Sequence, residues 1–169
     1  MTARILVAGI GNIFLGDDGF GSEVIRTAEI PQDGASVRVT DYGISGMHLA
    51  YDLLEDWDTL VLVDAVPSRG NPGTLHVFQA DHESDPTAMG FDGHSMDPAA
   101  VFAGLRALGG NPPYTVVVGC EAGSVEEGIG LSEPVAQAVP RAARAVEEIV
   151  AALQTHSVAT SRGGTEPCV

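Results

Sequence analysis

The sequence predicts an α/β fold, a three-layer sandwich in which a twisted, mainly parallel sheet of about five strands carries helices on both faces. Short apolar runs alternate with amphipathic helical patterns along the chain, which is the order expected for strand–helix–strand units. Three of the apolar runs are nearly continuous, as in strands that are buried on both faces of a parallel sheet. The length of 169 residues corresponds to one domain with a normal core.

Five runs have the composition and length of β-strands: RILVAG (4–9), SVRVTD (36–41), TLVLVD (59–64), TLHVF (74–78) and YTVVVGC (114–120). The runs at 4–9, 59–64 and 114–120 are almost wholly apolar and belong in the middle of the sheet. The runs at 36–41 and 74–78 alternate between apolar and polar residues, which predicts positions nearer the sheet edges.

Helical patterns fill the intervals between these strands. A short helix is predicted over about 19–29, and Ser45 is a good N-cap for the next one. Asp97 and Pro98 have the types preferred at an N-cap and a first helical position, and Ser132 opens the longest helix. Apolar stripes at helical spacing follow these last three starts: Ala50, Leu53, Leu54 and Trp57; Val101, Phe102, Leu105 and Leu108; and Val135, Val139, Ala142, Val146, Ile149 and Leu153.

The chain is predicted to form a single α/β domain over residues 1–155, with a flexible C-terminal tail over 156–169. The tail, HSVATSRGGTEPCV, has the composition of a frayed terminus. Residues 79–96 form a long polar connection, and connections of this length are usually functional or mobile.

The charge and composition exclude several classes of partner. The formal net charge is −15, and every one of the eight basic residues is an arginine. Nucleic acids and anionic membrane surfaces both require a basic footprint, so neither is expected to be a partner. The chain has no apolar run of about 20 residues and no recognisable signal peptide, which predicts a cytoplasmic protein. Cys120 and Cys168 do not form a metal-type pair, and no disulfide is expected in that compartment.

The stretch GIGNIFLGDDGFG (9–21) has some features of a nucleotide-binding loop but departs from it at decisive positions. A dinucleotide fingerprint needs a third glycine where Phe14 stands, and the lysine of a P-loop is absent from the whole chain. Asp17 and Asp18 would also repel a pyrophosphate. A dinucleotide-binding enzyme remains the less favoured alternative, and the glycines equally suit tight packing of a strand against a helix.

Three acids, Asp18, Asp41 and Asp64, follow or end the first three predicted strands. Ligands bind at the carboxyl ends of the strands in open α/β sheets, although each aspartate alone is also an ordinary turn or cap residue. Like charges gathered on one rim are costly unless a positive charge lies among them. His94 precedes a predicted helix and can reach the same rim. Two carboxylates and an imidazole form a ligand set for a borderline divalent metal, whereas a lone loop histidine can also be merely solvated.

The sequence contains no evident covalent nucleophile. Cys120 lies near the rim, but the spacing supplies no histidine partner for it. There is neither a G-x-S-x-G nucleophile elbow nor an H-E-x-x-H zinc motif.

Five stretches together resemble the NiFe hydrogenase maturation proteases, in order and with compatible spacing over about residues 4–153. In the family the first is an apolar strand with G-x-G-N and an acidic turn, the third an aspartate–alanine pair before a P-G-T turn, and the fourth a histidine before a helix. The matching stretches are ILVAGIGNIFLGDDGFG (5–21), DYGISGMHL (41–49), VLVDAVPSRGNPGT (61–74), GHSMDPAAVFAGL (93–105) and GLS (130–132).

The resemblance implies that residues 1–155 form a peptidase domain. Such a peptidase removes a C-terminal extension from the precursor of a NiFe hydrogenase large subunit after nickel has been inserted. Carried over by position, Asp18, Asp64 and His94 are the implied catalytic residues and the implied contacts to nickel. The nickel is expected to be supplied by the substrate, with other divalent metals able to replace it in vitro. Some family members have glutamate at the first of these positions.

The expected role of the metal is to act as a Lewis acid on the scissile carbonyl or on an attacking water, with Asp41 or Asp17 as the general base. Asp17 can alternatively brace the helix that follows it. Two alternatives remain open at this point: a non-catalytic module that checks nickel loading, and a peptidase on the same scaffold with a different substrate.

Overall fold

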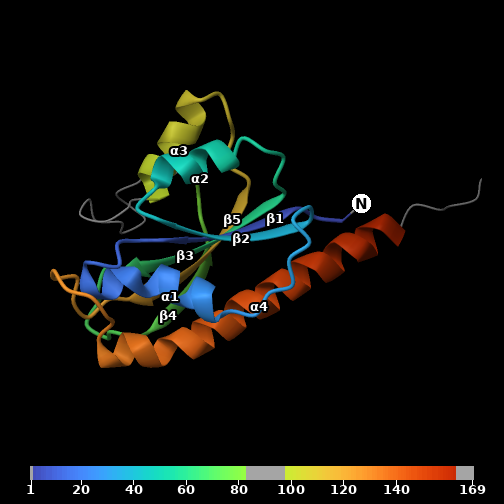
Figure 1. Cartoon of the computed structure of the whole chain (residues 1–169). Helices are drawn as coiled ribbons and strands as arrows, with labels where there is room; N and C mark the ends of the chain where they lie inside the picture. Colours follow the sequence, from blue (N-terminus) through green and yellow to red (C-terminus); the bar gives the residue numbers. More distant parts are fainter. Residues whose placement is uncertain (1, 83–97, 163–169) are drawn as a thin grey trace, which may run out of the picture.

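The computed structural model describes residues 2–82 and 98–162, which form a five-stranded sheet covered by helices (Figure 1). The strand order is β2-β1-β3-β5-β4, and only β4 runs antiparallel to its neighbour. The strands are β1 (Ile5–Ile10), β2 (Val37–Gly43), β3 (Thr59–Val66), β4 (Leu75–Gln79) and β5 (Tyr114–Glu121). The predicted mainly parallel sheet is therefore confirmed, with the two alternating strands, β2 and β4, at its edges.

The helices form the two outer layers of the sandwich, as predicted. Helices α1 and α4 cover one face of the sheet, whereas α2 and α3 cover the other (Figure 1). Because β2 and β3 lie on opposite sides of β1, right-handed crossovers place α1 and α2 on opposite faces. The helical elements are the 3₁₀ turn η1 (Gly16–Gly19), α1 (Phe20–Thr27), α2 (Gly46–Asp52), α3 (Pro98–Ala107) and α4 (Glu133–Arg162).

The continuous apolar runs are explained by two cores, one on each side of the sheet. In β1, Ile5 and Val7 pack with α1 and α4, while Leu6, Ala8 and Ile10 pack with α2 and α3. Successive side chains of a strand point to opposite faces, so a central strand covered on both sides needs apolar residues at every position.

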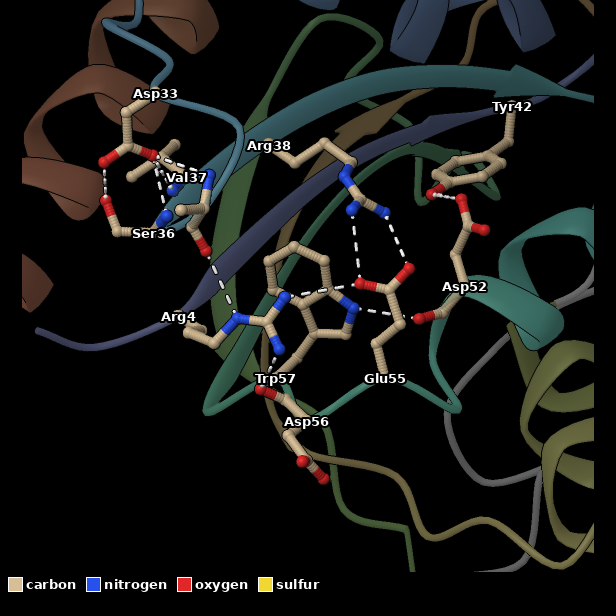
Figure 2. Close-up of polar contacts among 11 residues, drawn as sticks. Arg4, Asp33, Ser36, Val37, Arg38, Tyr42, Asp52, Glu55, Asp56 and Trp57 are labelled. Atoms are coloured by element: carbon tan, nitrogen blue, oxygen red, sulfur yellow. Dashed lines mark hydrogen bonds and ion pairs between the residues drawn. The ribbon is translucent and has the colours of Figure 1, made fainter.

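The stripe predicted from Ala50 to Trp57 is not one helix, because α2 ends at Asp52. Trp57 is nevertheless buried, and its indole N–H donates to the carbonyl of Asp52 (2.9 Å; Figure 2). The guanidinium carbons of Arg4 and Arg38 lie 4.5 and 4.9 Å from the centroid of the Trp57 ring. These cation–π contacts hold the tryptophan in a loop. The helical spacing of the apolar residues alone had predicted a helix there.

Glu55 completes this cluster at the edge of the sheet where β1 and β2 begin. Its carboxylate pairs with Arg4 at 3.3 Å and with Arg38 at 3.2 Å (Figure 2). The cluster joins the loop before β3 to Arg4, which precedes β1, and to Arg38 near the start of β2. The cluster covers this end of the sheet. The predicted acids Asp18, Asp41 and Asp64 lie at the opposite end, where β1, β2 and β3 finish.

The starts and the end of the predicted helices also differ in detail. Ser45 occupies the N-cap position of α2, but its side chain makes no capping hydrogen bond. Asp97 lies outside the described residues. Helix α4 continues through residues 156–162, where the sequence predicts a tail, because extending an existing helix costs far less than starting one. None of the described helices, α4 included, is long and apolar enough to cross a membrane.

Candidate active site

The carboxyl ends of three adjacent strands meet at one edge of the sheet. Gly9 of β1 pairs with Asp41 on one side and with Val63 on the other, so Asp41 and Asp64 flank the end of β1. Asp18 lies in η1, which is separated from the end of β1 by the five residues 11–15. The chain leaves β1 toward β2 on one side and reaches β3 on the other, which is the switch point where ligands bind in open α/β sheets.

Two glycines allow the turn after β1 to fold against the strands. A Cβ atom on Gly21 would lie 2.5 Å from the carbonyl oxygens of Ile10 and Val63. Gly11 has a φ of 131°, and a Cβ there would lie 2.0 Å from the carbonyl oxygen of Asp18. The glycines thus permit close contact with protein backbone, which supports the packing interpretation over a phosphate-binding loop.

Asp18 is only 2% exposed and lies on the inner side of this turn. Its Oδ2 atom accepts a hydrogen bond from the backbone N–H of Asn12 (2.7 Å). The Asn12 side chain accepts a hydrogen bond from the backbone N–H of Phe14 (2.9 Å). Asn12 therefore stabilises the turn both as a donor and as an acceptor. The Asp18 carboxylate is therefore held in place by the loop that leaves β1.

Asp64 is 1% exposed and lies near the end of β3, paired in register with Gly119 of β5. Asp64 therefore lies at the carboxyl edge of the sheet, the edge from which the chain continues into the turn that carries Asp18. Within residues 2–82 and 98–162, no three histidine, cysteine or acidic side chains form a group that could hold a metal ion. His94, the third predicted contact, lies outside the described residues.

Asp41 is exposed at the end of β2. Its Oδ1 atom accepts hydrogen bonds from the Ser22 hydroxyl (2.8 Å) and from the backbone N–H of Gly43 (3.0 Å). Ser22 therefore links α1 to β2. The contacts orient one carboxylate oxygen and leave the side chain open to solvent.

Asp17, by contrast, is fully buried and accepts four hydrogen bonds. Oδ2 accepts from the N–H groups of Gly123 (2.7 Å) and Ser124 (2.9 Å) and from the Ser132 hydroxyl (2.8 Å). Oδ1 accepts from the N–H of Ser132 (2.6 Å). The carboxylate ties η1 to the loop after β5 and to the residue that precedes α4.

These contacts keep Asp17 in its charged form. Burial raises the pKa of the Asp17 carboxyl, but the hydrogen bonds from Ser124, Ser132 and Gly123 outweigh it, and the pKa lies below its ordinary value. A carboxylate with a lowered pKa and four donors is a weak proton acceptor. The bracing role therefore suits Asp17 better than that of a general base, and the Ser132 hydroxyl serves this brace.

Glu121, a further acid at this edge, was not singled out from the sequence. It is buried at the end of β5 and accepts hydrogen bonds from the His76 ring (2.8 Å) and the backbone N–H of Arg69 (2.7 Å). The bond with His76, followed by that from Arg69, lowers the pKa of the Glu121 carboxyl. Glu121 thereby holds the loop that follows Asp64. An acid directly after a buried apolar run was the signal that could have found it.

Cys120 is buried and unsuited to act as a nucleophile. Desolvation, with a smaller contribution from the charge of Asp17, raises the pKa of its thiol to about 11. The thiolate is the reactive form, and a pKa this high leaves almost none of it at neutral pH.

Three comparisons with known proteins agree with one another. Residues 23–149 match the model of the HycI hydrogenase maturation protease family. The chain is 32% identical to the hydrogenase 2 maturation protease of Escherichia coli K12 over 160 residues, which cover 92% of this chain and 93% of that one. It is 32% identical to the hydrogenase expression/formation protein HupD of Rhodobacter capsulatus over 167 residues, 96% of this chain and 77% of that one. The solved structure of the hydrogenase maturating endopeptidase HybD from E. coli matches with a TM-score of 0.70 and 31% identity, covering 90% of this chain and 93% of the other.

Proposed function

The chain belongs to the hydrogenase maturation protease family, and on that premise we propose that it removes the C-terminal extension of a NiFe hydrogenase large-subunit precursor after nickel insertion. The observation that carries this proposal is the pair of buried aspartates at the carboxyl edge of the sheet, Asp18 in the turn after β1 and Asp64 near the end of the adjacent strand β3. Burial of a carboxylate costs free energy unless hydrogen bonds or a positive charge stabilise it, and a metal ion bound at this edge would supply such a charge.

The donor set fits nickel that is carried by the substrate. Asp18 and Asp64 would contribute carboxylate oxygens, and His94 would contribute an imidazole nitrogen from the segment between β4 and α3. Oxygen and imidazole ligands together suit a borderline divalent ion. Nickel bound there would act as a Lewis acid on the scissile carbonyl or on the attacking water.

The other residues of the site have distinct roles in this proposal. Asp41 is the favoured general base because it is exposed and is oriented by Ser22 and Gly43. Asn12 holds the Asp18 carboxylate through its backbone N–H, and Asp17 holds η1 against the rest of the domain. The buried Cys120 has no part in the cleavage.

The decisive experiment compares two forms of one substrate, a C-terminally extended large subunit with and without nickel. We expect the protein to release the extension from the nickel-loaded form at least about a hundredfold faster, because the metal supplies the contact between substrate and acids. The released peptide is quantified by mass spectrometry. Cleavage of neither form, or of both equally, would overturn the proposal. Tight binding of the nickel-loaded form without cleavage would instead identify a nickel-checking module.

Replacement of Cys120 by alanine is expected to leave cleavage of the nickel-loaded precursor within about twofold of the unmodified protein. The thiol is buried and protonated, so its loss removes only packing, at a cost of about 1–2 kcal/mol of stability. Activity is measured per folded protein, with circular dichroism as the check on folding. A folded Cys120→Ala protein without activity would show that the thiol takes part in the reaction.

A further inference from the structure

A groove of about 500 Å³ lies between η1, α1 and the first turns of α4, on the outer side of the turn that carries Asp18. Most of its lining is apolar side chain or glycine. Its two charged residues, Glu23 and Arg26, pair with each other at 2.9 Å. Its apolar walls include Ile13, Ile129, Leu131 and Val139.

The groove adjoins the candidate site through η1. Gly16 and Gly19 line the groove, whereas Asp17 and Asp18, which stand between them in the chain, are buried and do not line it. The single turn η1 therefore separates the groove from the candidate site. A polypeptide lying in the groove can reach the site within a few residues.

Two loops beside the groove carry an unusual number of exposed large apolar side chains. We name these four residues the apolar rim: Ile13, 43% exposed; Phe14, 58%; Val125, 50%; and Ile129, 79%. The N–H of Gly16 donates a hydrogen bond to the carbonyl of Gly128 (2.9 Å), and the N–H of Gly128 donates one to the carbonyl of Phe14 (2.8 Å). The two loops that carry these side chains are thus joined by backbone hydrogen bonds, and several exposed large apolar side chains on joined loops favour an interaction site.

The charges around the groove indicate the chemistry of its occupant. Glu126 and Glu127 are exposed on the same loop as Ile129, and exposed Glu133 begins α4. The one cation in the lining, Arg26, is already paired with Glu23. A segment with apolar side chains and nearby basic side chains is complementary to this surface, and the net charge of −15 favours its approach.

We propose that this groove binds the C-terminal extension of the precursor as an extended segment, with apolar side chains in the groove and basic side chains beside Glu126 and Glu127. This inference rests on the proposed function. The mature part of the precursor is positioned by its metal centre at the acids. The extension is not held by the metal centre, and the groove provides a separate binding site for it.

Ile129→Asp tests the groove, with Tyr51→Asp as the matched control. Tyr51 is 55% exposed on α2, on the opposite face of the sheet, so the control introduces the same charge at a distant apolar site. We expect Ile129→Asp to raise KM for the nickel-loaded precursor about tenfold with kcat nearly unchanged, and Tyr51→Asp to leave both unchanged. A merely structural defect in the site would lower kcat instead.

A fluorescently labelled synthetic peptide with the sequence of the extension provides a second measurement that does not depend on cleavage. We expect it to bind the full-length protein, with Kd raised about tenfold by Ile129→Asp. We also expect the double variant Glu126→Gln with Glu127→Gln to bind more weakly at low salt and to show a smaller salt dependence.

The outcomes separate this inference from the proposed function. If the precursor is cleaved but Ile129→Asp leaves KM and peptide affinity unchanged, the groove proposal is wrong and the proposed function stands. If the precursor is not cleaved while the peptide binds and Ile129→Asp weakens it, the groove is supported and the proposed function fails. Self-association that is lost in Ile129→Asp, with no peptide binding, would assign the groove to a second copy of the chain and overturn the proposal.

Discussion

Replacing Asp18 by asparagine is expected to lower kcat/KM for the nickel-loaded precursor by at least about a hundredfold, and Asp64→Asn is expected to do the same. Asparagine has nearly the shape of aspartate, and its amide oxygen can still accept the hydrogen bond from the N–H of Asn12. Both substitutions therefore remove a charge while they preserve the side-chain volume, and Asp18→Asn also keeps the contact with Asn12. The loss should fall on the interaction with the metal centre rather than on the fold.

Asp56→Asn is the matched control for this pair. Asp56 is exposed beside the Trp57 cluster at the other end of the sheet, and its carboxylate points away from that cluster (Figure 2). The control should keep full activity. Precursor cleavage is measured alongside the free energy of unfolding in urea, so that a loss of folded protein is not mistaken for a loss of catalysis. Full activity in both Asp18→Asn and Asp64→Asn would remove the basis of the proposed site.

The second large effect is expected on stability. Replacing Asp17 by alanine should lower the free energy of unfolding by about 3–5 kcal/mol, because it removes the four hydrogen bonds that the buried carboxylate accepts from Gly123, Ser124 and Ser132. Asp17→Asn should lower the free energy of unfolding by less, since the amide oxygen of asparagine still accepts hydrogen bonds. It should still be destabilising, because the NH₂ group of asparagine would face other donors. The control Asp56→Ala should stay within about 0.5 kcal/mol of the unmodified protein.

The pH dependence of stability provides an independent check on Asp17. Its carboxyl pKa is lowered in the folded protein, so its contribution is fully present above the unfolded value of 3.8 and is lost as the pH falls through the lower folded value. The unmodified protein should therefore lose stability below about pH 4 more steeply than Asp17→Asn does. Parallel acid limbs for the two proteins, measured by urea unfolding from pH 7 to pH 2.5, would contradict the bracing role.

Much of the fold could be predicted because it is encoded in local patterns. Five predicted strands match the observed ones within two residues at either end. A strand between two helical layers must be apolar throughout, and an edge strand may alternate, so composition alone distinguished the centre from the edges. The position of Trp57 was predicted wrongly because it does not depend on the local pattern. It stands at helical spacing, but contacts with Arg4 and Arg38, which are distant in the sequence, decide its position.

The candidate site was only partly readable in the same way. Acids at the ends of parallel strands must share an edge once the strands pair, so the proximity of the ends bearing Asp18, Asp41 and Asp64 follows from topology. His94 stays a prediction from sequence. Glu121 obeys the same strand-end rule, yet its contacts to Arg69 and His76 come from segments 52 and 45 positions away.

The sequence by itself determined the layers of the sandwich, the central strands and the edge at which the acids gather, because periodicity and burial are local properties of the chain. Only the tertiary structure decided what each of two adjacent aspartates does. Asp17 accepts hydrogen bonds from residues as far as 115 positions along the chain, whereas Asp18 is held by Asn12, six positions away. Neighbours in sequence differ in this way because η1 places them in different surroundings, and those surroundings are assembled from strands and loops that meet only when the sheet has formed.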